Sequence, residues 1–166
     1  MNLQGGSFSA AGSAFLAAGR NAASLFILNG TGTNFSGLTL SAAAGDFASV
    51  LEARDAELVL SGVNLGVSAR DTCALTLTRS PALVIDSVIH AQGSFSARAV
   101  EFSGSFPRVQ NCRFHFEGEA KRSEVFSGME GAARQSPDSA GIFMNSLSGN
   151  VYSGFSRIWN GITGFE

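Results

Sequence analysis

The sequence has few charged residues, few cysteines and no long apolar run. Only 14% of its 166 residues are Asp, Glu, Lys or Arg, and the formal net charge is −2. Binding of nucleic acid by bulk electrostatics needs a basic surface, so we expect no nucleic-acid partner. No run of about 18 apolar residues occurs, so we expect no membrane insertion. Met1 is not followed by the charged and apolar regions of a signal peptide.

Cysteine and histidine are equally scarce. Cys73 and Cys112 are the two cysteines, and both occupy apolar positions of a strand pattern, so we expect them to be small buried hydrophobes. The two cysteines are expected on different walls of the fold, which predicts no disulfide between them. His90 is expected at the edge of the core and His115 in solvent. These residues do not show the spacing of zinc ligands, and we expect no metal and no cofactor.

What the sequence does contain is a repeat of about 25 residues. Each unit reads apolar, two turn-type residues, apolar, any residue, apolar. The units begin at Phe35, Leu60, Ile85 and Val109, in steps of 25, 25 and 24. A repeat of this length indicates the stacked coils of a solenoid. The positions expected to form one stacked corner are Gly37, Gly62, Ser87 and Asn111.

A further strand precedes each unit, so that a coil contains three short strands and three turns. The pattern predicts an all-β fold, a right-handed parallel β-helix solenoid with about 25 residues per coil. A β-sandwich would show turns every 8 to 12 residues but no long period, and frequent Gly, Ser and Thr disfavour a helical repeat. One short helix is allowed at 13–19. The expected interior ladders are Phe26–Leu51–Leu75–Val100, Phe35–Leu60–Ile85–Val109 and Leu38–Val63–Val88–Cys112.

The pattern extends along nearly the whole chain, which predicts a single β-helix domain over 1–166. A charge-rich stretch at about 117–140 interrupts it and is expected to leave the coil as an inserted loop. Such a loop is either a binding loop or a solvated excursion, and the second is favoured. The chain begins and ends in mid-coil. Each end is therefore either capped by a lid or continued by flanking coils of a longer β-helix, and we favour continuation.

Coils of this kind, with Gly or Asn corners and aliphatic ladders from Leu25 to Phe155, resemble the pectate-lyase-like superfamily of right-handed β-helices. The resemblance is one of architecture, which serves lyases, glycosidases, tailspikes and adhesins alike. It implies a groove along one sheet, where lyases hold calcium with acidic residues and use Arg or Lys as a base. The family's glycosidases use close aspartates, a Gly-His-Gly element and an Arg-x-Lys element, and none of these occurs here.

The outer face of the first strand of each coil carries the carbohydrate-binding candidates Glu52, Thr76 and Glu101, with Arg54 and Arg79 at the adjoining turn. The two glutamates are expected two coils apart, about 10 Å, which is loosely compatible with an inverting carboxylate pair. Solvated glutamates are the favoured interpretation, and we assign no catalytic residue.

These observations favour a non-catalytic structural or binding β-helix domain of a larger exported or cell-surface protein. The alternative is a carbohydrate-active enzyme, a polysaccharide lyase or glycoside hydrolase, or a fragment of one. The expected partners are a polysaccharide or other surface ligand, and flanking β-helix coils in the parent chain.

Overall fold

The computed structural model describes residues 1–128 and 147–160, and these form a parallel β-solenoid of about five turns without a helix. The strands are β1 (Asn2–Gly6), β2 (Ser9–Ala11), β3 (Ala14–Gly30), β4 (Thr33–Ser36), β5 (Thr39–Arg54), β6 (Leu58–Ser61), β7 (Asn64–Thr78), β8 (Ala82–Ile85), β9 (Val88–Ser103), β10 (Arg108–Gln110), β11 (Arg113–Glu117), β12 (Arg122–Gly128), β13 (Leu147–Ser148), β14 (Val151–Ser153) and β15 (Arg157–Asn160). No helix that could cross a membrane is found in these two stretches.

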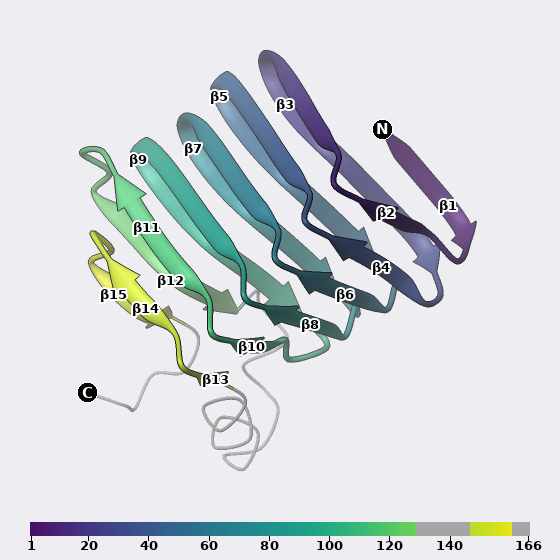
Figure 1. Ribbon diagram of the computed structural model, residues 1–166. Helices are drawn as coiled ribbons and strands as arrows, with labels where there is room; N and C mark the ends of the chain where they lie inside the picture. Colours follow the sequence, from purple (N-terminus) through teal and green to yellow (C-terminus); the bar gives the residue numbers. More distant parts are fainter. Residues whose placement is uncertain (129–146, 161–166) are drawn as a thin grey trace.

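The strands form two parallel sheets that run the length of the stack (Figure 1). The larger sheet has the order β1-β3-β5-β7-β9-β11-β14, with β12 paired to β9 and β15 paired to β12. The smaller sheet has the order β13-β10-β8-β6-β4-β2. Each coil thus passes from a long strand to a short one and then to the next long strand.

Each coil contains the three expected strands, but two of the three are joined end to end as one long strand. Each long strand doubles back at the end away from the short strands (Figure 1). At this bend the register shifts, for example between Ala43 and Phe47 where β5 pairs with β7. The bend divides each long strand into a first and a second half, which form two walls of the coil, and the short strand forms the third.

One corner of the coil is a column of left-handed backbone conformations. Gly37, Gly62, Asp86 and Asn111 have φ of 59°, 59°, 50° and 54°. Glycine, Asn and Asp are the residues that adopt this conformation at least cost. The N–H of each donates to the carbonyl of the next coil, as Gly37 does to Ser61 at 2.9 Å and Asp86 to Gln110 at 3.1 Å. The expected corner is confirmed at three positions and wrong at the fourth, where Asp86 takes the place predicted for Ser87.

The interior is filled by ladders of apolar side chains with fully buried members. The ladders observed are Leu25–Leu51–Leu75–Val100–Phe126, Phe35–Leu60–Val84–Val109 and Leu38–Val63–Ser87–Cys112. Three predicted members were wrong by one residue, namely Phe26, Ile85 and Val88. These are two errors of register, one at Phe26 and one shared by Ile85 and Val88. Each arises in an uninterrupted apolar run, Leu25 to Leu28 or Leu83 to Ile85, where a shift of one residue leaves the apolar pattern intact.

Two other expectations are corrected by the strands. The short helix expected at 13–19 is instead the beginning of β3, which pairs with β5. The inserted loop expected at 117–140 does not begin at Glu117, because β12 (122–128) pairs with β9 and buries Val125 and Phe126 in the core. Residues 129–140 lie outside the described residues.

The bend between β11 and β12 is made by residues 118–121, and Gly118 is required there. Its φ is 132°, and a Cβ at this position would collide with the backbone of Gly93 on β9. The coil that follows β9 therefore contains two separate strands where the earlier coils have one long strand.

Ser87 is the one polar side chain inside its ladder, and hydrogen bonds account for it. Its Oγ donates to the carbonyl of Ile85 at 2.7 Å and accepts from the N–H of Val63 at 3.2 Å. We expect Ser87→Ala to lower the free energy of unfolding by about 1–3 kcal/mol, because the buried Val63 N–H loses its acceptor. Urea denaturation measures the difference. Ser36→Ala, at an exposed position, is the control, and equal midpoints for the two variants would contradict the assignment.

Candidate functional site

Three of the predicted binding residues form one row across the second halves of the long strands. Glu52 of β5 pairs with Thr76 of β7, and Thr76 pairs with Glu101 of β9. The next position in the row is Ser127 of β12. Since neighbouring strands are about 4.8 Å apart, the two glutamates are separated by about 10 Å. The register expected from the sequence is confirmed for these residues.

The two predicted arginines lie toward the end of these strands and differ in their surroundings. Arg54 is exposed, two residues after Glu52 on β5. Arg79 follows β7, and its guanidinium donates to both carboxylate oxygens of Asp55, at 2.6 and 2.7 Å. This hydrogen-bonded pair lowers the pKa of the Asp55 carboxyl. Arg79 is thus held against the corner of the preceding coil, and the structure does not bring it into the row.

The row ends in a groove of about 530 Å³ that crosses β9 and β12. The exposed side chain of Phe95 lies at its border, with the guanidinium carbon of Arg70 5.0 Å from the ring centroid. Its lining includes Phe95, Ser96, Arg98, Glu101, Arg122 and Ser127. Glu101 is therefore a predicted candidate that lines this groove.

A second row, not anticipated from the sequence, lies beside the first. Ser49, Cys73, Arg98 and Glu124 pair with one another on successive strands. Arg98 donates to Glu101 at 2.6 Å, with side-chain exposures of 26% and 17%. The fully buried Glu124 accepts from Arg122, also at 2.6 Å. Two charged hydrogen bonds, Arg98–Glu101 and Arg122–Glu124, thus involve residues of these rows beside the groove.

Cys73 shows how strongly this region is desolvated. The thiol is fully buried and contacts the hydroxyl of Thr76, which donates to Sγ at 3.2 Å. Burial raises the pKa of Cys73 to about 11, and the nearby Glu101 carboxylate adds to the effect. Cys112 is also buried and free, as the sequence predicts, and burial raises its pKa as well.

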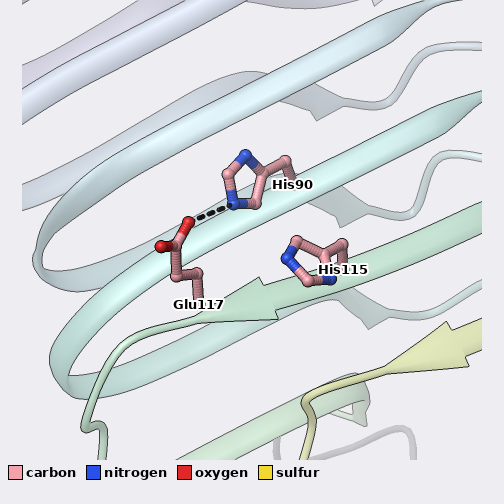
Figure 2. A group of neighbouring side chains, drawn as sticks. All are labelled: His90, His115 and Glu117. Carbon is pink, nitrogen blue, oxygen red and sulfur yellow. Dashed lines mark ion pairs between the residues drawn. The ribbon is translucent and has the colours of Figure 1, made fainter.

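A cluster of possible metal ligands lies on the first half of β9 and on the neighbouring strand β11. His90 of β9 is the direct neighbour of His115 on β11, with ring centroids 5.1 Å apart. Glu117 follows on β11, and its Oε2 lies 3.7 Å from Nε2 of His90. Figure 2 shows the three side chains together outside the strands, with a nitrogen of each ring turned toward Glu117. One ligand atom from each residue lies within 4.8 Å of the others.

The expectation that His90 lies at the edge of the core, level with Leu65, is wrong. In the observed register Ile89 pairs with Leu65, and His90 pairs with Gly66. The error is the same shift of one residue that displaced Ile85 and Val88. A signal was nevertheless present, because His90 and His115 are separated by one 25-residue step and therefore stack.

No family model, curated protein or solved structure matches the chain. The assignment of the fold as a parallel β-solenoid therefore rests on the geometry of the coils alone.

The raised pKa of Cys73 predicts a loss of stability at alkaline pH. An unfolded thiol ionises near pH 8.5, whereas the folded thiol keeps its proton until about pH 11. The contribution is therefore complete below about pH 8 and is lost as the pH rises through that interval. Between about pH 8 and pH 11 we expect the free energy of unfolding of Cys73→Ala to fall by about 3 kcal/mol less than that of the parent protein. Urea melts across this range measure the difference, and an unchanged pH dependence would refute it.

Proposed function

We propose that the chain is a non-catalytic structural and ligand-binding β-helix domain of a larger exported or cell-surface protein. Its ligand is an extended polysaccharide or a similar surface polymer, bound across the outer face of the long strands. The observation that carries the proposal is the groove across β9 and β12, where the exposed Phe95 borders the Arg98–Glu101 ion pair.

The chemistry of this groove suits a neutral or weakly charged sugar polymer. An aromatic side chain supplies an apolar surface, while guanidinium, carboxylate and hydroxyl groups supply directed hydrogen bonds. The Arg98–Glu101 contact fixes both charged groups before any ligand arrives, which reduces the entropy lost on binding. The row of Glu52, Thr76, Glu101 and Ser127 places one polar residue on each successive strand, about 4.8 Å apart, so the polar surface extends beyond a single sugar.

The arrangement of the two predicted glutamates favours binding over hydrolysis. Glu101 accepts a hydrogen bond from Arg98 at 2.6 Å and is 17% exposed at its side chain. Glu52 lies two strands away, with Thr76 between them. One carboxylate of the pair is thus already engaged by a guanidinium.

The proposal of flanking coils rests on the first coil of the stack. Ala10 and Phe15 occupy the ladder positions of Phe35 and Leu40 but are only partly buried, whereas Phe35 and Leu40 are fully enclosed. An uncovered solenoid end exposes such apolar side chains. A further β-helix coil of the parent chain would cover them. Membership of the pectate-lyase-like superfamily belongs to the same proposal and is supported by the coil alone.

The test is binding and turnover on a panel of acidic and neutral polysaccharides. We expect affinity electrophoresis to show binding, and reducing-end and unsaturated-product assays to show no turnover. Phe95→Ala should weaken binding about tenfold, or about 1.4 kcal/mol, because the apolar contact is lost. Leu16→Ala removes another exposed apolar side chain, one on β3 with 77% exposure, and should have no effect.

Two results would overturn the proposal. If Phe95→Ala and Leu16→Ala bind the polysaccharide with equal affinity, the groove is not the binding site. Turnover that disappears in Glu52→Gln or Glu101→Gln would establish the enzyme instead.

A further inference from the structure

We propose that His90, His115 and Glu117 bind a divalent transition-metal ion, with Zn²⁺ as the reference ion, and leave a fourth coordination position to water. The site is separate from the polysaccharide groove, since it lies on the first half of β9 and on β11. The proposal does not depend on the polysaccharide proposal.

The fold itself brings the three ligands together. Two positions that pair directly on parallel strands lie about 4.8 Å apart, which places the two imidazoles side by side. Positions two residues apart on one strand share a face, which places Glu117 beside His115. The site therefore needs no loop and no rearrangement of the backbone.

A third strand supplies a hydrogen-bond partner for His115. Ser153 of β14 pairs with His115, and its Oγ lies 2.9 Å from Nδ1. The same hydroxyl donates its hydrogen to the carbonyl of Phe114 at 3.2 Å. While its hydrogen is given to Phe114, the hydroxyl accepts from Nδ1–H of His115. This leaves the Nε2 lone pair of His115 available toward Glu117, and outer partners of this kind orient metal-ligating histidines.

His90 presents the second nitrogen. Its Nε2 is buried and has no hydrogen-bond partner in the described part of the chain. The Oε2 of Glu117 is 3.7 Å away, beyond hydrogen-bonding distance. Zinc with bonds of about 2 Å places tetrahedral ligand atoms about 3.4 Å apart. An ion between Nε2 and Oε2 thus satisfies both groups with a small movement of exposed side chains.

The donor set selects the class of ion. Two imidazole nitrogens and one carboxylate suit Zn²⁺, Ni²⁺ or Cu²⁺, whereas Ca²⁺ and Mg²⁺ prefer sites made only of oxygen. Arg113 lies two residues before His115 on the same face of β11, and its charge opposes any cation nearby. The imidazoles must therefore supply the affinity, as they do for borderline metals.

A bound ion would join two successive coils through side chains. It would connect β9 to β11 directly, and β14 through Ser153. Because only the folded chain presents the three ligands together, binding would raise the melting temperature by mass action.

The test uses the full chain labelled with ¹⁵N-histidine, because its two histidines are both in the site. On addition of ZnCl₂ we expect the Nε2 resonances of both rings to shift together and to saturate at one equivalent, while Nδ1 of His115 keeps its proton. CaCl₂ should cause no shift. Imidazole signals that ignore Zn²⁺, or that respond equally to Ca²⁺, would overturn the proposal without recourse to any variant.

Variants then identify the ligands by competition with a zinc-binding dye. His90→Gln, His115→Gln and Glu117→Gln should each weaken Zn²⁺ binding more than Ser153→Ala, which should cost about tenfold as an outer partner. Glu119→Gln removes an exposed carboxylate two residues further along and should leave the affinity unchanged. Unchanged affinity in the three ligand variants would place the ion elsewhere. Circular dichroism confirms that each variant is folded.

Discussion

The structure depends on the parallel ladder of backbone hydrogen bonds that joins each coil to the next. This ladder places every residue beside the residue one coil away, at about 4.8 Å. Inside the coil the constraint favours apolar residues at each position, because a polar side chain would stack on apolar neighbours and lose its hydration. Ser87 satisfies the constraint in another way, since its hydroxyl bonds to two backbone groups of the corner.

The left-handed corner keeps the ladder in register from coil to coil. A residue of positive φ at the same place in each coil turns the chain by the same amount, so that the walls on either side remain parallel. Gly62 and Asp86 occupy this place on neighbouring coils although their side chains differ. The two residues share a backbone conformation. The corner is therefore defined by a positive φ at this position, and not by one type of residue.

The sequence was sufficient for the coil, the three-walled plan and most of the interior, because the period is visible wherever alternation is interrupted by a turn residue. It failed where the alternation itself is lost. In Leu83 to Ile85 any of the residues can face inward, and the structure selects Val84 because Ser87 and Asp86 then meet their backbone requirements. Strand β12 was missed for a different reason. Its charged residues Arg122 and Glu124 are typical of an exposed loop in a sequence, but in the structure they pair with each other.

The same shift of one residue hid the histidine cluster, because it moved His90 from the outer face to the inner one. The pair of histidines follows from the 25-residue step once the register is known, but Ser153 does not. It lies 38 residues after His115, since the coil between them is longer than the others. No fixed period could have placed its hydroxyl on Nδ1.

Both polar sites, the groove and the histidine cluster, involve β9 and the coil that follows it. This is where one long strand is replaced by β11 and β12, with residues 118–121 between them. The interruption allows charged residues to gather on either side of the bend while Phe114 and Phe126 continue the interior ladders and pack against each other, with ring centroids 5.4 Å apart. The core therefore tolerates the change because its own ladder is unbroken. Chemistry on the outer face of a solenoid can vary from coil to coil for the same reason: stacking constrains the side chains that point inward far more than those that point outward.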